Sequence, residues 1–266
     1  MTRQFTLGVA SAAVLAAASL AGSPAQEWSL KIEAVPSPAA PGSGQPQLTV
    51  SDRGALLSWI ERAGDKATLK FAERLGNGWS EARPVASGTD WFVNWADVPS
   101  VIRLTDGTLY AHWLQKSGPS TYAYDVQLSR SVDDGKTWAP SLTPHHDGTQ
   151  TEHGFASLFQ APGAGLGLVW LDGRAMKAGG HDGHGGGGDM SVRAAAFDRT
   201  GKQTAETPVD LRVCECCPTA VAVTSEGPIV AYRDRSPNEI RDISISRLVG
   251  GQWTPPATVH ADGWRI

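Results

Sequence analysis

The chain has 266 residues, of which 41% are hydrophobic, and a formal net charge of −4 at pH 7. This slightly acidic charge, without any lysine or arginine run, argues against a nucleic-acid partner. The 30 glycines, 17 prolines and 10 tryptophans are typical of a turn-rich β protein.

The first 25 residues have the layout of a secretory signal. Arg3 precedes an apolar run over 5–20, and Ser23 and Ala25 occupy the −3 and −1 positions of a cleavage site. The run is shorter than the ~20 residues of a membrane span, although a short anchor is the alternative. A bacterial lipobox would carry cysteine at position 23. We therefore expect residues 1–25 to be removed, and a periplasmic or extracellular product without a lipid or transmembrane segment.

Residues 26–45 are rich in proline, alanine, serine and glycine, which predicts a linker. From residue 46 the chain repeats one order of features. Each repeat opens with a strand of small residues and reaches an aromatic residue 13 or 14 positions later, in a second, apolar strand. An alternating third strand and a closing turn follow. These aromatics recur 54, 57 and 62 residues apart, at Trp59, Trp113, Trp170 and Tyr232.

Four short antiparallel strands in about 50 residues make one blade of a β-propeller. A blade cannot bury both faces alone, so neighbouring blades supply the missing apolar contacts. We therefore predict an all-β propeller domain over 46–266. Its blades are expected at about 46–88, 95–145, 152–210 and 214–260. A β-sandwich is the alternative, but it would not explain the regular recurrence.

A turn signature closes the second repeat, at Ser131, Asp133, Gly135, Thr137 and Trp138. Asp133 can accept hydrogen bonds from its own turn, Gly135 supplies a positive φ, and Trp138 can pack under the turn. The pattern Ser-x-Asp-x-Gly-x-Thr-Trp resembles the Asp-box of BNR repeats in sialidase-like β-propellers. The stretches Trp-x-Asp-Gly-Arg and Tyr-Arg-Asp-Arg resemble bacterial exported proteins of the exo-α-sialidase type. The likeness concerns the repeat architecture and not the chemistry.

The resemblance implies a six-bladed ring. Residues 261–266 follow the fourth repeat where a further blade would begin. We therefore expect four blades plus a stub, and a chain cut short at its C-terminus. A closed ring of four blades is the alternative.

The loops before the innermost strands are expected to meet at one end of a central channel. They contribute Asp97, Glu152 and His153, with Trp91 and Trp95 beside the first. Arg174 and Arg233 follow equivalent middle-strand aromatics. Carboxylates and exposed aromatics suit a carbohydrate or another small polar ligand. Asp97, Glu152, Arg174 and Arg233 are our catalytic candidates, and ordinary polar loops are the alternative.

Sialidases, by the same resemblance, clamp the substrate carboxylate with three arginines and use a tyrosine nucleophile beside a glutamate, with an aspartic acid as the acid. Arg174, Arg233, Arg235 and Arg241 could form such a clamp, or could be satisfied by Asp234, Glu239 and Asp242 as ion pairs. The Arg-Ile-Pro opening of sialidases is replaced by Gly44-Gln45-Pro46. The catalytic set therefore looks incomplete.

All three cysteines, Cys214, Cys216 and Cys217, lie in four consecutive residues. They could form a disulfide, act as reactive thiols, or bind a soft metal ion with His153 as a fourth ligand. The glycine-rich stretch 179–189 offers a second candidate metal site with His181, His184 and Asp189, or is simply a mobile insert.

Two functions follow from these features. The first is an exported protein that recognises or hydrolyses glycosides and requires no cofactor. The alternative is a non-catalytic propeller module or scaffold that holds a metal ion through its cysteines or its histidine–glycine loop.

Overall fold

The computed structural model describes residues 29–163, 165–176, 187–263 and 265. The expected signal peptide lies outside them. The chain divides into two units, residues 1–34 and 35–266, and the strands of the described residues all belong to the second. No helix in the described part of the chain is long and apolar enough to cross a membrane.

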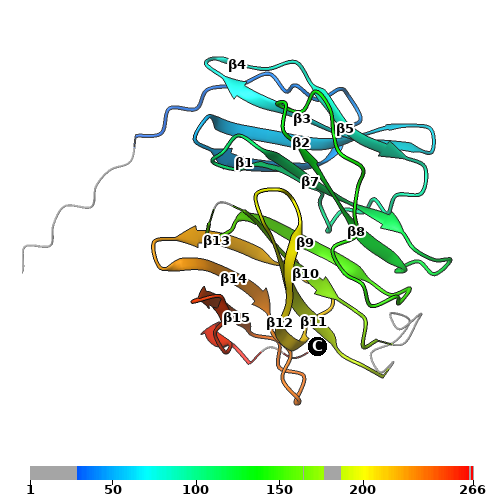
Figure 1. Cartoon of the computed structure of the whole chain (residues 1–266), viewed down its shortest axis with the longest axis vertical. Helices are drawn as coiled ribbons and strands as arrows, with labels where there is room; N and C mark the ends of the chain where they lie inside the picture. Colours follow the sequence, from blue (N-terminus) through cyan, green and yellow to red (C-terminus); the bar gives the residue numbers. More distant parts are fainter. Residues whose placement is uncertain (1–28, 164, 177–186, 264, 266) are drawn as a thin grey trace, which may run out of the picture. The chain divides into compact units, whose positions relative to one another are not determined.

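The second unit consists of four antiparallel sheets that follow one another along the chain (Figure 1). The first sheet contains β1 (Gly44–Ser51), β2 (Gly54–Ala63), β3 (Lys66–Leu75), β4 (Gly78–Trp79) and β5 (Arg83–Gly88). The second contains β6 (Ser100–Arg103), β7 (Leu109–Lys116) and β8 (Tyr124–Ser131). An isolated bridge between Leu128 and Leu142 lies beside β8, where a fourth strand would pair.

In each of the remaining two sheets, the first four strands again pair in chain order. The third contains β9 (His153–Gln160), β10 (Leu166–Asp172), β11 (Met190–Phe197) and β12 (Gln203–Val213). The fourth contains β13 (Ala220–Thr224), β14 (Gly227–Arg233), β15 (Ile243–Val249), β16 (Gln252–Trp253) and β17 (Ala257–His260). The protein is therefore all-β, with four antiparallel sheets that resemble propeller blades, and we call them blades 1 to 4.

The first hairpins of blades 1 and 4 are built alike. Gly54 and Gly227 begin the second strands with φ of 118° and 109°, values that favour glycine. In each hairpin the hydroxyl of Ser51 or Thr224 accepts a hydrogen bond from the amide two residues later. Blades 1 and 4 therefore share hydrogen bonding as well as strand order.

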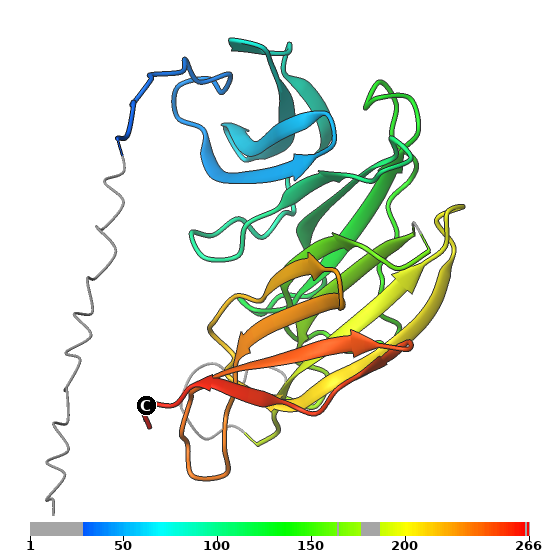
Figure 2. The ribbon, with the colours of Figure 1, turned by 90° about the vertical axis from the view of Figure 1, so that its left-hand side faces the viewer.

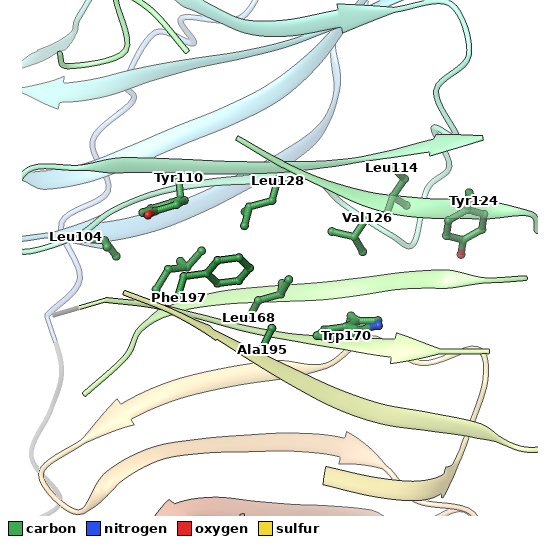
Figure 3. Packing of buried hydrophobic residues seen from close by; sticks show 11 residues of the cluster. Leu104, Tyr110, Leu114, Tyr124, Val126, Leu128, Leu168, Trp170, Ala195 and Phe197 are labelled. Atoms are coloured by element: carbon green, nitrogen blue, oxygen red, sulfur yellow. The ribbon is translucent and has the colours of Figure 1, made fainter. Parts of the chain in front are cut away.

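Three buried apolar clusters lie between successive blades. The cluster between blades 2 and 3 joins residues of β7 and β8 to residues of β10 and β11, and Figure 3 shows the two sets pointing toward one another. The clusters between blades 1 and 2 and between blades 3 and 4 are built in the same way. The middle strands are therefore apolar on both faces; β10 is buried at every position.

The middle-strand aromatics occupy equivalent positions. Trp113, Trp170 and Tyr232 each contribute to the cluster with the preceding blade. Trp59, which has the corresponding place in β2, is only 1% exposed. The regular recurrence in the sequence thus corresponds to a repeated packing contact in the structure.

The innermost strands β1, β6, β9 and β13 line one open channel of about 700 Å³. Figure 2 shows the same sheets after a 90° turn about the vertical axis of Figure 1. Short side chains link these strands. The Thr49 hydroxyl of β1 donates to the Val101 carbonyl oxygen of β6 at 2.7 Å, and the Ser157 hydroxyl of β9 donates at 3.0 Å to the carbonyl oxygen of Thr219, just before β13. Strand directions place the starts of β6, β9 and β13 and the ends of β7, β10 and β14 at one end of the channel, which we call the rim.

The Asp-box segment forms a hydrogen-bonded turn between blades 1 and 2. The Asp133 carboxylate accepts hydrogen bonds from the Thr137 amide at 2.9 Å and hydroxyl at 2.7 Å, and Ser131 bonds both Asp133 and the Gly135 amide. Gly135 has φ of 78°, and a Cβ there would lie 2.4 Å from the Phe71 ring of blade 1. Trp138 meets the same ring edge-on, so the turn contributes to the contact between the blades.

Beyond the fourth sheet, Arg265 forms an isolated bridge with Ile240 of blade 4. Residues 261–263 of the expected stub carry no strand, and 264 and 266 lie outside the described residues.

Candidate functional site

Three polar groups gather at the rim. The first contains Asp97, Tyr124 and Glu152; the second surrounds His153; the third surrounds the three cysteines. The first two lie beside each other, because Tyr124 and Asp125 are consecutive, as are Glu152 and His153. Consecutive strand residues point to opposite faces, which separates the two groups.

Asp97, Tyr124 and Glu152 form what we call the acid group. The Tyr124 hydroxyl donates to Glu152 Oε1 at 2.6 Å, and the Phe155 amide donates to Asp97 Oδ2 at 2.6 Å. All three side chains are buried. Asp97 Oδ1 is buried without a hydrogen-bond partner in the described structure, and Asp97 lines the channel.

The backbone next to the acid group is strained and tightly packed. Phe155 has φ of 50°, a left-handed conformation that non-glycine residues rarely adopt. A Cβ on Gly154 would lie 2.1 Å from Asp97 Oδ2 and 2.7 Å from the Tyr124 ring. Strain of this kind persists where the surroundings enforce it, and it is common at functional sites.

The electrostatics of the acid group raise the pKa of Asp97. Burial, opposed by the Phe155 amide and assisted by the nearby Glu152, raises the pKa of Asp97 to about 7. Burial and Glu152 also raise the pKa of Tyr124 well above its usual value. No cation is among the groups that shift the pKa of Asp97. The wall of the channel therefore carries, at Asp97, a carboxyl group that can give or take a proton near neutral pH.

Aromatic side chains flank the residues of the acid group in the chain. Trp95, two residues before Asp97, is 90% exposed, and Tyr122, two residues before Tyr124, is 40% exposed. Phe92 stacks on Tyr124 with ring centroids 4.1 Å apart. An exposed tryptophan two residues from a buried acid offers a surface that suits the apolar face of a sugar ring.

The second group, the histidine network, is a buried set of ion pairs between blades 2 and 3. His153 is 0% exposed, with Nδ1 3.3 Å from Asp125 and Nε2 3.3 Å from Asp147. Burial opposes the charge, but these carboxylates and Asp172 raise the pKa of His153 to about 9. His145 stacks on His153 at 3.8 Å, and burial together with the charge of His153 lowers the pKa of His145 to about 4.

Arg174 extends the histidine network. Its guanidinium donates to both oxygens of Asp172 at 2.7 Å and to Glu206 at 2.7 Å. Trp170 donates its indole N–H to the same Asp172 at 2.8 Å. Burial works against ionisation of Asp172, yet Arg174 and His153 lower its pKa. Arg174 thus pairs with Asp172, Glu206 and, at 3.5 Å, Asp147, and not with the carboxylates expected for it, Asp234, Glu239 and Asp242.

The other arginines of the expected clamp belong to blade 4. Arg233 donates to the Arg241 carbonyl oxygen at 2.6 Å, Arg235 pairs with Glu239 at 2.9 Å, and Arg241 pairs with Glu215 at 2.9 Å. The structure therefore brings Asp97 and Glu152 together, places Arg174 in the adjacent network, and gives Arg233 contacts within blade 4.

The third group, the cysteine cluster, lies in the loop between β12 and β13. All three cysteines of the chain are described and are free thiols, and their Sγ atoms lie 3.3, 3.6 and 3.8 Å apart. The Cys214 amide donates to the Arg233 carbonyl oxygen at 3.0 Å. Hydrogen bonding with Cys217 and Arg241, against the effect of burial, lowers the pKa of Cys214 to about 5.

His153 does not belong to the cysteine cluster, contrary to the expectation of a fourth ligand. Its ring nitrogens face Asp125 and Asp147, and no histidine or carboxylate among the described residues joins the three sulfur atoms. Of the glycine-rich candidate site, His181 and His184 lie outside the described residues. Asp189 is 3.6 Å from Arg212 and 3.7 Å from Arg235.

The residues expected at the rim did not include Tyr124, Asp125, His145, Asp147 or Asp172. Asp172 had a local signal, because Trp-x-Asp-Gly-Arg places a carboxylate two residues before Arg174 and two after Trp170. Tyr124 meets Glu152 only through the packing of β8 beside β9, which a single sequence does not reveal.

Comparison with known proteins gives structural likenesses only. No protein-family model matches the chain, and no curated protein matches it. A protein of unknown function from Dyadobacter fermentans DSM 18053 is similar over 84% of this chain and 70% of that one, with 16% identity and a TM-score of 0.56. A polysaccharide lyase of family PL25, an ulvan lyase, is similar over 84% of this chain and 59% of that one, with 14% identity and a TM-score of 0.51.

An α-L-arabinanase from Penicillium chrysogenum has 13% identity over 87% of this chain and 71% of that one, with a TM-score of 0.49. The first two likenesses are distant and concern the fold alone, which the four blade-like antiparallel sheets define.

Proposed function

We propose that this protein recognises a glycoside at the rim and that the acid group is its reactive centre. The observation that carries the proposal is Asp97: it is buried and lines the channel, its pKa is raised to about 7, and one of its oxygens has no partner in the described structure. The nearby Trp95 offers a stacking surface. The likeness to a polysaccharide lyase agrees with a carbohydrate ligand.

For hydrolysis, Asp97 would act as the general acid that protonates the glycosidic oxygen as the C–O bond breaks. Glu152 would accept a proton from the attacking group. A tyrosine hydrogen-bonded to a glutamate, with an aspartic acid close by, is also the set of residue types that the sialidase resemblance implies. A sialidase-type reaction, with Tyr124 as nucleophile, is therefore the finer form of the proposal. Arg174 and Arg233 stabilise the blades in this assignment and do not clamp the substrate.

The test is a panel of fluorogenic glycosides, sialosides included, with calorimetric titration of the same sugars. We expect turnover to fall as pH rises above 7, and Asp97→Asn to lower kcat by about 100-fold or more while binding persists. The matched control is Asp65→Asn, an exposed carboxylate in the β2–β3 turn, which should change neither quantity.

Glycoside binding without turnover would restrict the function to recognition. If no sugar binds or reacts, or if Asp97→Asn leaves turnover unchanged, the proposal is wrong.

A further inference from the structure

The loop between β12 and β13 gathers three thiols on one side of a turn. Cys214 is 1% exposed, Cys217 is partly buried and Cys216 is exposed, so the cluster extends from the interior to the surface. Three sulfur atoms bound to one ion at about 2.3 Å in tetrahedral geometry lie about 3.8 Å apart. The observed separations of 3.3, 3.6 and 3.8 Å are close to that triangle.

The surroundings of Cys214 supply fixed positive charge. Arg241 has a side chain only 2% exposed, and its Nη1 donates to Cys214 Sγ at 3.2 Å. The same guanidinium is held by Glu215 at 2.9 Å and by Glu239 at 3.2 Å. A guanidinium fixed in this way stabilises a sulfur atom that carries negative charge, as a metal-bound thiolate does.

The backbone also holds the loop in place. The hydrogen bond from the Cys214 amide to the Arg233 carbonyl oxygen ties the end of β12 to the end of β14, and Val213 bridges Asp234 beside it. The start of the loop is therefore positioned by blade 4 before any ion binds, which lowers the entropy lost on binding.

We propose that Cys214, Cys216 and Cys217 together bind one thiophilic d¹⁰ metal ion, zinc(II) or copper(I). Thiolates select these two ions over hard cations such as magnesium and calcium. Because the three sulfurs are the only candidate ligands that the described residues place together here, the ion keeps an open side at the exposed Cys216. Copper(I) would be three-coordinate, and zinc(II) would take water as a fourth ligand. The site is independent of the proposed glycoside function.

The experiment uses the full chain, reduced and freed of metal under anaerobic conditions. Zinc(II) and copper(I) are titrated separately against chromophoric chelators selective for each ion, and cobalt(II) serves as a spectroscopic probe. We expect one ion per chain, a sulfur-to-cobalt charge-transfer band, and protection of the accessible Cys216 and Cys217 from N-ethylmaleimide only in the loaded protein. The ion that the protein retains in the presence of the stronger competing chelator is the natural occupant.

Serine at position 214, 216 or 217 should weaken binding by more than about 100-fold, since loss of outer partners alone commonly weakens it 10- to 100-fold. Arg241→Lys should fall in that outer-partner range. Glu226→Gln, an exposed change in the β13–β14 turn that removes no thiol and no contact of Arg241, should stay within about threefold.

The proposal is overturned if the reduced chain takes up neither ion, if the cysteine variants bind as tightly as the original, or if the native protein contains a disulfide among these residues that excludes metal. The maleimide measurement needs no variant, so a misfolded substitution does not prevent the test.

Discussion

Glu152 and His153 are neighbours in the chain, yet they belong to buried groups with opposite electrostatics. In the histidine network, Asp125 and Asp147 face the ring of His153, while Asp172 faces Arg174. In the acid group, the pKa of Asp97 is shifted by burial, an amide, a carboxylate and a phenol, and by no cation. Two consecutive residues therefore belong one to a network that contains cations and the other to the group of Asp97, whose pKa no cation shifts.

The difference indicates which buried groups at the rim stabilise the fold and which are available for chemistry. A buried carboxylate with a cation beside it is satisfied in the folded state, and removing the cation leaves an unpaired charge. A buried carboxylate without a cation keeps its proton and is poised for proton transfer. The histidine network is accordingly expected to stabilise the contact between blades 2 and 3, and the acid group to perform the chemistry.

The largest effect is expected from His153→Gln. The change leaves the Asp125 and Asp147 carboxylates without their buried cation, and we expect the free energy of unfolding in urea to fall by about 3 kcal/mol. Glu152→Gln, the matched change in the adjacent residue, should lower it by less than about 1 kcal/mol.

The stabilisation by His153 should also depend on pH. Its folded pKa of about 9 lies above the unfolded value of about 6.5, so the contribution is complete below pH 6.5 and is lost as pH rises through 9. A difference between the two proteins that stays constant from pH 6 to pH 10 would contradict the imidazolium assignment.

A smaller effect is expected from Gly154→Ala. The added methyl would collide with Asp97 Oδ2 and Tyr124, and the over-packing should reduce the free energy of unfolding by about 2 kcal/mol. Gly78→Ala is the control, since a Cβ there meets nothing within 4 Å, and it should change stability by less than about 0.5 kcal/mol. Equal effects of the two changes would contradict the tight packing of the acid group.

Asp97→Asn should alter the pH dependence of stability. The folded pKa of about 7 exceeds the unfolded value of about 3.9, so the folded state binds the extra proton between these pH values. The stability that the native chain owes to Asp97 therefore falls as pH rises from 4 to 7, and the asparagine variant lacks this decline. Urea midpoints of both proteins at pH 4, 5.5 and 7 measure it, and parallel profiles would contradict the raised pKa.

Trp95→Ala should have the smallest effect on folding and a clear effect on binding. Because the side chain is 90% exposed, stability should change by less than about 0.5 kcal/mol. Sugar affinity should fall, since the stacking surface is lost. Val132→Ala, a 70% exposed change in the Asp-box turn, should leave affinity unaltered.

Much of the fold could be predicted from the sequence because repetition made it visible. Trp113, Trp170 and Tyr232 recur because each lies in the contact of its blade with the one before it, and Trp59 has the same place in blade 1. Asp97 and Glu152 could be selected because both precede innermost strands. The rest could not be predicted: the meeting of Tyr124 with Glu152, and of His153 with Asp125, depends on how β8 packs beside β9, which local patterns do not encode.

The most direct measurement is a carbon-13 NMR titration of the aspartate carboxyl groups, with the Asp97 resonance assigned by its loss in Asp97→Asn. A midpoint near pH 7, as the uncompensated burial of this carboxyl requires, would support an acid poised for proton transfer at the rim. A midpoint near 4, the value of an ordinary solvated aspartate, would contradict the distinction between the two groups on which the proposed function depends.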